Sequence, residues 1–175
     1  LENIVTKFKK KFTIRRLIFV ADRGLFSKKN LDVLRSDSGE FIVGHKLGTM
    51  SKVKKDEIYD INKFTFVVRD ELAVYEEKTD AGDRLIVTWS RKRAERDEKT
   101  RNDILEKIRK KLGTKKVTAK KFVSNSNYQK FVKGLDQGKP EINEKAILEA
   151  SKKDGFFGIV TNVKDLSSAE IVLNY

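Results

Sequence analysis

The chain has 175 residues, of which 38% are hydrophobic and 37% charged, which fits one domain with a real core or one domain carrying a large insertion. It contains no cysteine and one histidine, which excludes disulfides, zinc–cysteine sites, a thiol nucleophile and a site with several histidines. No apolar run reaches the ~18 residues of a membrane span, and no signal-peptide pattern opens the chain. These features predict a soluble, intracellular, basic α/β protein with no membrane partner.

The positive charge is concentrated in two segments of the chain. The formal net charge is +13. Residues 1–16 hold six basic residues and one acidic residue, and residues 91–121 hold fourteen basic and five acidic residues, while the remainder is close to neutral. Clustered basic side chains are typical of nucleic-acid binding, so we expect a polyanionic partner. The alternative is a solvated surface that keeps the protein soluble.

The first predicted elements form a βαβ unit. The continuous apolar run of residues 17–21 predicts a strand buried on both faces. Ser27 follows as a helix cap for a helix that reaches Leu34, and residues 41–47 predict the next strand. Strand, helix and strand within about 30 residues indicate that the two strands are parallel.

The pattern of apolar and polar residues changes in the middle of the chain. Residues 51–60 are polar and predict a short helix. Residues 64–78 and 84–89 show alternating apolar positions on either side of a turn, which predicts an antiparallel hairpin.

A long helix is predicted from Ser90 to Leu112, and Gly113 ends it. Its second half carries an apolar stripe at helical spacing, made of Ile104, Leu105, Ile108 and Leu112. Its first half has Ala94 as its one apolar residue, so we expect that half to face solvent or a partner.

The C-terminal part contains two further helix starts. Asn143 is positioned to cap a helix through Lys153, and residues 156–161 predict a strand. Ser167 and Glu170 form a capping-box pattern that begins a helix with no stop signal before the last residue. Together with a first residue that is not methionine, this predicts a piece excised from a longer protein.

Asp22 is the sharpest candidate for chemistry. It directly follows a predicted buried strand, and ligands of open α/β sheets bind at the carboxyl ends of strands. A carboxylate there is a suitable oxygen ligand for Mg²⁺ in phosphoryl transfer. The alternative is that Asp22 caps the turn at Arg23 and Gly24 or pairs with Arg23. One carboxylate does not make a two-metal site, and no second acid stands out at an equivalent strand end.

The chain resembles DDE-type insertion-sequence transposases of the subgroup with a YREK signature. The resemblance is carried, in order, by residues 19–27 (FVADRGLFS), the strand FIVG at 41–44, LIVTWSRKRA at 85–94, DGFFGIVTN at 154–162, and residues 166–175. The single string Ala-Asp-Arg-Gly is weak, whereas the ordered set covers most of the chain.

This resemblance implies an α/β fold with a partial ribonuclease H-like core and a β-rich α+β insertion. Residues 1–47 and 156–175 would belong to the core, and residues 48–155 to the insertion. In the family, two aspartates and one glutamate bind two Mg²⁺ or Mn²⁺ ions, and Asp22 matches the second aspartate. The first aspartate would precede Leu1, and the glutamate would follow Tyr175, which resembles the tyrosine of the signature. The isolated segment would therefore be inactive.

The implied function is metal-dependent cleavage and strand transfer at the ends of an insertion sequence. The implied partners are transposon-end and target DNA and further copies of the full-length protein, in the bacterial cytoplasm at the nucleoid. Two alternatives stay open, which are a ribonuclease H-like structure-specific nuclease and a non-catalytic basic DNA-binding module.

Two basic clusters are the candidate DNA contacts. Arg91, Lys92 and Arg93 have no acidic residue three or four positions before them, which favours contact with phosphates. Further along the helix, several Glu–Lys and Asp–Arg pairs at i,i+4 favour a solvated helix instead. The first cluster is Arg91, Lys92, Arg93 and Arg96, and the second is Lys110, Lys111, Lys115 and Lys116, continued by Lys120 and Lys121. Trp89 and His45 are interpreted as structural residues rather than as base-stacking or catalytic groups.

Overall fold

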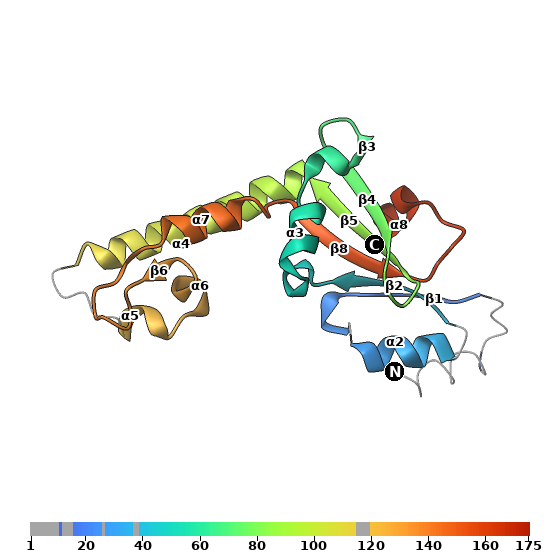
Figure 1. The fold of residues 1–175 in the computed structure, drawn as a ribbon, viewed down its shortest axis with the longest axis horizontal. Helices are drawn as coiled ribbons and strands as arrows, with labels where there is room; N and C mark the ends of the chain where they lie inside the picture. Colours follow the sequence, from blue (N-terminus) through green and yellow to red (C-terminus); the bar gives the residue numbers. More distant parts are fainter. Residues whose placement is uncertain (1–10, 12–15, 26, 37–38, 115–119) are drawn as a thin grey trace. The chain divides into compact units, whose positions relative to one another are not determined.

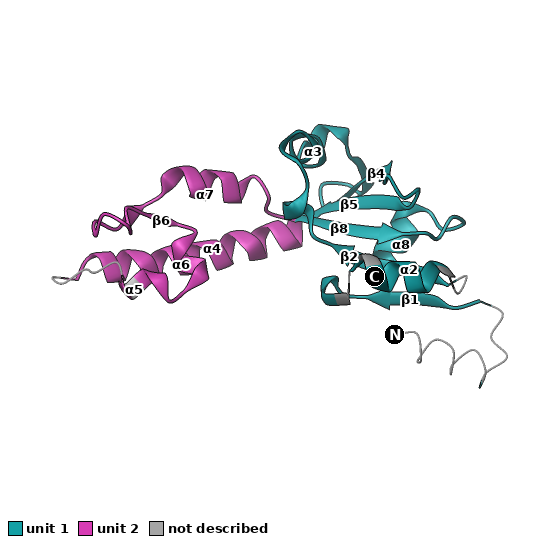
Figure 2. Cartoon of the chain, turned by 60° about the horizontal axis from the view of Figure 1, so that its bottom comes forward, with its two compact units in different colours: residues 1–90, 156–175 teal, residues 91–155 magenta. Residues whose placement is uncertain are grey.

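The computed structural model describes residues 11, 16–25, 27–36, 39–114 and 120–175. The chain divides into two compact units, which Figure 2 colours separately. Unit 1 contains Leu1–Ser90 and Phe156–Tyr175, and unit 2 contains Arg91–Gly155. The predicted mixture of helices and strands is confirmed, and none of the helices in the described part of the chain is long and apolar enough to cross a membrane.

Unit 1 is built on a six-stranded sheet with the strand order β1-β2-β8-β5-β4-β3 (Figure 1). Its strands are β1 (Ile18–Ala21), β2 (Glu40–His45), β3 (Thr65–Val68), β4 (Leu72–Lys78), β5 (Arg84–Ser90) and β8 (Phe156–Thr161). β1 and β2 are parallel, and every other neighbouring pair is antiparallel. The predicted parallel pair and the predicted hairpin of β4 and β5 are therefore both confirmed.

Helices cover both faces of this sheet. On one face, α2 (Lys28–Ser36) and α3 (Lys52–Ile58) contribute Leu31, Leu34 and Ile58 to a core with alternate residues of β5. On the other face, α8 (Ser168–Asn174) contributes Ile171, which packs with Ile86 of the same strand. Alternate residues of β5 thus belong to two separate cores, because successive side chains of a strand point to opposite faces of the sheet.

The position of β1 differs from the predicted one. It is the edge strand of the sheet in the described part of the chain, paired with β2 alone, and Val20 is 50% exposed. The strands buried on both faces are β2, β5 and β8. An apolar run indicates that its side chains are buried, but it does not indicate how many strands will pair with it. That number depends on which other segments of the chain pair with the strand.

The helix starts follow the predicted caps. Ser27 Oγ accepts the Asn30 amide at 3.1 Å at the start of α2, which extends two residues beyond the predicted end at Leu34. The full capping box is present at α8, where the Ser167 hydroxyl accepts the Glu170 amide and the Glu170 carboxylate accepts the Ser167 amide. These side chains replace hydrogen bonds that the first turn of a helix lacks.

Unit 2 is mainly helical. Its elements are α4 (Arg91–Leu112), α5 (Lys120–Val123), α6 (Ser126–Gln129), α7 (Glu144–Ser151) and a two-stranded sheet of β6 (Val132–Lys133) and β7 (Glu141–Ile142). The predicted stripe of α4 is confirmed, since Leu105 and Ile108 are buried against Phe122 and Phe131. Asn143 caps α7 by accepting the Ala146 amide at 3.2 Å.

The compact units do not coincide with the predicted insertion at residues 48–155. The segment that forms its own compact unit is 91–155, which is mostly helical, while the three strands β3, β4 and β5 lie in residues 48–90. Residues 48–90 belong to unit 1 because β5 pairs along its length with β8, which continues the sheet from β2. The boundary between the two units at residues 90 and 91 is set by hydrogen bonding between strands that are distant in sequence. Local sequence patterns do not indicate where it lies.

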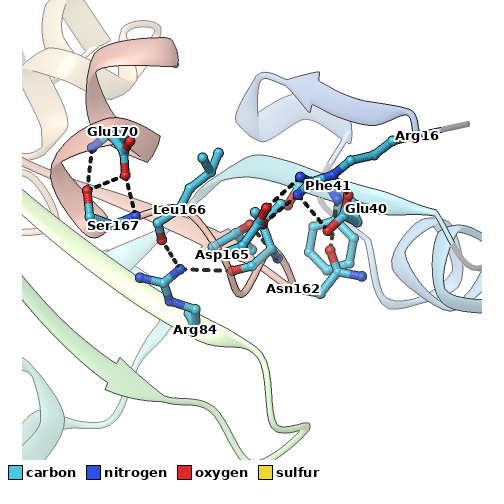
Figure 3. A network of polar contacts seen from close by, with 11 residues as sticks. Arg16, Glu40, Phe41, Arg84, Asn162, Asp165, Leu166, Ser167 and Glu170 are labelled. Atoms are coloured by element: carbon cyan, nitrogen blue, oxygen red, sulfur yellow. Dashed lines mark hydrogen bonds and ion pairs between the residues drawn. The ribbon is translucent and has the colours of Figure 1, made fainter.

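A polar network fixes the loop between β8 and α8 (Figure 3). Arg84 donates to the carbonyl oxygens of Val163 at 2.8 Å and Leu166 at 2.6 Å, and its other nitrogens contact Glu76. Arg16 holds the same loop through two 2.6 Å contacts to Asp165, while also pairing with Glu40. The start of α8 is thereby attached to β2, β4 and β5.

We expect Ile171→Ala to destabilise unit 1 by about 2–5 kcal/mol, because the side chain is fully buried and a cavity remains when it is truncated. Leu173→Ala is the matched control on the same helix, since Leu173 is 71% exposed and its truncation should cost no more than about 0.5 kcal/mol. Urea unfolding followed by the fluorescence of the single tryptophan, Trp89, measures both. Equal effects of the two variants would contradict the placement of α8 on the sheet.

Candidate functional site

Asp22 lies where the sequence places it, directly after β1. Its side chain is exposed, and its Oδ1 accepts the Arg23 amide at 2.6 Å at the start of a 3₁₀ turn (Arg23–Leu25). This is the turn-capping contact of the alternative interpretation, and it occupies one carboxylate oxygen. The capping contact and a ligand role are compatible, because a carboxylate has two oxygens and about four lone-pair sites.

Three segments meet beside Asp22, at the edge of the sheet that is formed by the ends of its strands. The ends of the parallel strands β1 and β2 meet there, and β8 begins there because it runs antiparallel to β2. α8 starts near the opposite edge, where Arg84 contacts Ser168 at 3.4 Å, and Ile171 packs onto the sheet between its ends. The last residues of α8 therefore lie toward the edge of the sheet that carries Asp22.

Tyr175 and Arg23 both lie over Gly44 of β2. A Cβ atom placed on Gly44 would lie 2.6 Å from the Tyr175 hydroxyl and 2.8 Å from Arg23 Cγ, so only glycine permits this approach. The Arg23 guanidinium lies 5.4 Å from the centre of the Phe157 ring, and that ring is 5.3 Å from the Tyr175 ring. Tyr175, which directly follows α8, and Arg23, the residue next to Asp22, thus pack over the same glycine and against the same Phe157 ring.

The described residues offer one candidate oxygen ligand and not a complete metal site. Asp22 is an exposed carboxylate at a strand end and fits the role of one ligand to a hard cation. No group of three or more acidic, histidine or cysteine side chains able to hold a metal ion occurs among residues 11, 16–25, 27–36, 39–114 and 120–175. No catalytic step is assigned to these residues alone.

The first predicted DNA-binding cluster lies on the first turns of α4 in unit 2. Arg91, Lys92 and Arg96 are exposed, and Arg93 is half-buried. Among its neighbours, Arg96 lies 3.8 Å from the carboxylate of Asp97. The cluster is therefore accessible to a polyanion, and its role in DNA contact stays a prediction.

The second predicted cluster is a separate surface at the other end of α4. Lys110 pairs with Glu106 at 2.7 Å, and the Lys111 ammonium lies 4.5 Å from the centre of the Tyr128 ring. Eighteen residues of helix separate Lys92 from Lys110, which is roughly 27 Å at 1.5 Å per residue. Lys115 and Lys116 lie outside the described residues.

The interpretation of Trp89 as a core residue is confirmed, since it packs on the α2–α3 face with its ring 6.4 Å from that of Phe66. Phe156 and Phe157 also pack against the two cores, on opposite faces of the sheet.

His45, at the end of β2, is half-buried, and burial lowers the pKa of its imidazole below the ordinary 6.5. The unfolded chain therefore binds a proton at higher pH than the folded chain does. As pH falls below 6.5 toward the folded-state pKa, protonation favours unfolding and stability is lost.

We expect the melting temperature of unit 1 to fall between about pH 7.5 and about pH 5.5 more in the natural chain than in His45→Gln. Thermal unfolding at several pH values, followed by Trp89 fluorescence, measures the difference. Identical pH dependence of both proteins would show that His45 makes no such contribution.

Sequence reasoning missed Arg23, His45 and Lys46 as members of the site. All three line one cavity at the edge of the sheet that carries Asp22. A usable signal was present for Lys46, because it comes directly after the second of two parallel strands, and such strands end at a common edge. Phe156 and Phe157 line the same cavity, although their strand follows Lys46 by more than 100 residues. No local sequence pattern predicts this contact between distant segments.

Comparison with known proteins returned no match among protein-family models, curated proteins or solved structures. The function is therefore inferred from the residues and their geometry.

Proposed function

We propose that this chain is the middle part of the catalytic region of a DDE-type DNA transposase, with Asp22 as one of three carboxylate ligands for two Mg²⁺ or Mn²⁺ ions. The observation that supports it most directly is the meeting of Asp22, Arg23 and Tyr175 at one edge of the sheet. Residues more than 150 positions apart in the chain converge there.

The direction of α8 agrees with this proposal. The resemblance to the transposase family expects the catalytic glutamate on the helix that begins at Ser167, a few residues beyond Tyr175. In the structure this helix begins beside Arg84, at the opposite edge of the sheet, and Tyr175 lies over Gly44, as does Arg23. The helix thus ends beside Arg23, the residue after Asp22, which supports the proposal of a partner carboxylate further along it.

The metal ions, when bound, would activate a water or a DNA 3′-hydroxyl and stabilise the leaving oxygen. The chain's own contribution is the position of the Asp22 carboxylate, which is fixed because one oxygen is bonded to the Arg23 amide. The chemistry requires no histidine or cysteine nucleophile, in agreement with the composition.

The basic surface of α4 is proposed to bind the DNA backbone. Contacts from Lys and Arg to phosphates give affinity that depends on salt and little on base sequence. Arg91 and Lys92 are exposed at the start of a 22-residue helix, which suits contact with an extended polyanion.

The test is a strand-transfer assay with the full-length protein that contains this chain. With Mg²⁺ and DNA carrying the ends of its element, we expect both cleaved ends and joined products. Cleavage without joining would support the structure-specific nuclease instead. Salt-dependent DNA binding with no cleavage would support the non-catalytic binding module.

A further inference from the structure

A cavity of about 340 Å³, lined in part by Arg23, the residue after Asp22, opens within unit 1 at the edge of the sheet where β1 and β2 end. We call it the edge cavity. Its walls come from the ends of β1 and β2, the start of β8 and the end of α3, and the side chains relevant here are Arg23, His45, Lys46, Tyr59, Phe156 and Phe157. Its size is within the range of pockets that bind small ligands or groups.

The charge of the edge cavity separates it from the other cavities described. Arg23 and Lys46 are its charged residues, and no acidic residue lines it. A larger cavity of about 620 Å³ in the same unit is lined by three acidic and three basic residues. A third cavity, in unit 2, combines three basic residues with Asp97 and Asp154. The edge cavity alone among these three has positive charge without a lining carboxylate.

Both cations of the edge cavity are exposed, and the fold fixes the Arg23 side chain and the backbone position of Lys46. Arg23 packs over the Phe157 ring and against Gly44, and Lys46 follows directly after the end of β2. Among the described residues, neither side chain forms an ion pair with a carboxylate. An anion entering the cavity therefore meets two cations that form no ion pair with a described acidic residue.

Aromatic side chains form part of the cavity wall and exclude water from that part. Tyr59 and Phe156 pack edge to face at 5.2 Å, and burial raises the pKa of the Tyr59 hydroxyl, which keeps that residue neutral. Electrostatic attraction to an anion is stronger where water is partly excluded. Arg23 adds a planar fork of donors that matches the oxygens of a phosphate group.

We infer that the edge cavity binds a phosphodiester group of the DNA strand on which Asp22 acts, with Arg23 and Lys46 as its positioning residues. This rests on the proposed function for the identity of the strand. The cavity adjoins the Asp22 carboxylate through Arg23, so a phosphate held there lies on the strand close to the proposed metal ligand.

The histidine in the wall of the cavity provides a local probe. His45 is the only histidine of the chain, so its imidazole proton resonances are assigned without labelling. We expect a short DNA duplex added to the 175-residue chain to shift these resonances and to raise the pKa of His45, because a nearby anion favours the protonated imidazole. Inorganic phosphate is the second probe and should shift them in the same direction at higher concentration.

The variant Lys46→Gln should reduce the slope of log affinity for DNA against log salt by about 0.9, the effect of one phosphate contact. It should also reduce the shift of the His45 resonances. Lys52→Gln is the matched control, because Lys52 is an exposed lysine of the same unit that does not line the cavity. Arg23→Lys is the second variant and retains the charge while removing the planar fork; Trp89 fluorescence confirms folding.

The inference is overturned if DNA leaves the His45 resonances unmoved, or if Lys46→Gln matches the Lys52→Gln control in slope and shift. A shift with inorganic phosphate and none with DNA also overturns it, since the cavity would then take only a free anion. Failure of the proposed function is seen separately, as absence of Mg²⁺-dependent cleavage by the full-length protein.

Discussion

Replacement of Asp22 by asparagine should lower Mg²⁺-dependent DNA cleavage by the full-length protein at least about 100-fold, because a catalytic metal supplies several kcal/mol and each 1.36 kcal/mol is a factor of ten in rate. The substitution removes the charge and keeps the shape. The amide oxygen of asparagine can still accept the Arg23 N–H, so the turn after β1 should remain intact. DNA affinity should not fall, since Asp22 is not among the proposed phosphate contacts and its replacement removes a negative charge beside them.

Asp32→Asn is the control for this prediction. Asp32 is an exposed acid on α2 in the same unit, where it pairs with Arg35 at 2.7 Å, and its neutralisation should leave cleavage intact. Cleavage rates and binding of a labelled duplex are measured for both variants. Retained cleavage in Asp22→Asn would remove Asp22 from the metal site and leave the turn-capping role as its only function.

Replacement of Arg101 by alanine should destabilise unit 2 by about 3–5 kcal/mol, the cost of leaving one partner of a buried ion pair alone. Arg101 is 9% exposed on α4, and its guanidinium contacts the carboxylate of Asp154, just after α7. In the same turn, the Gly155 amide donates to Asp97 of α4 at 3.2 Å. The pair therefore links the two longest helices of unit 2 where α7 ends.

Two further variants separate a lost ion pair from lost packing. Arg96→Ala changes a 65% exposed arginine of the same helix and should cost no more than about 1 kcal/mol. The double variant Arg101→Met with Asp154→Leu removes both charges together and should recover most of the stability, because neither charge is left buried alone. Urea unfolding followed by far-UV circular dichroism measures all three, and a double variant as unstable as Arg101→Ala would contradict the explanation.

Local chemistry in the sequence was sufficient for most element starts. Ser27, Asn143 and Ser167 each cap the helix that the sequence predicts there, because a cap satisfies amides within its own first turn. The stripe of α4 was equally readable, since Leu105 and Ile108 lie on one face at helical spacing and face a core. These signals act over three or four residues, and no distant segment is needed to interpret them.

The assignment of strands to neighbours was not readable in this way. The apolar run of β1 predicted burial on both faces, yet β1 is at the edge in the described part of the chain, and Val20 is half-exposed. The boundary predicted at residue 48 moves to residue 91, because β5 pairs with β8 across more than 60 residues of intervening chain. A strand's own side chains do not specify which strand supplies its hydrogen bonds.

The sequence by itself determined the charge distribution, the helix caps, the parallel βαβ unit and the place of Asp22 after a strand, because each depends on neighbouring residues. Only the tertiary structure decided that Arg23, Lys46, Phe157 and Tyr175 surround that strand end. The physical reason is that the sheet joins β1, β2 and β8 by backbone hydrogen bonds that any sequence can make, so the edge they share exists only once the chain has folded.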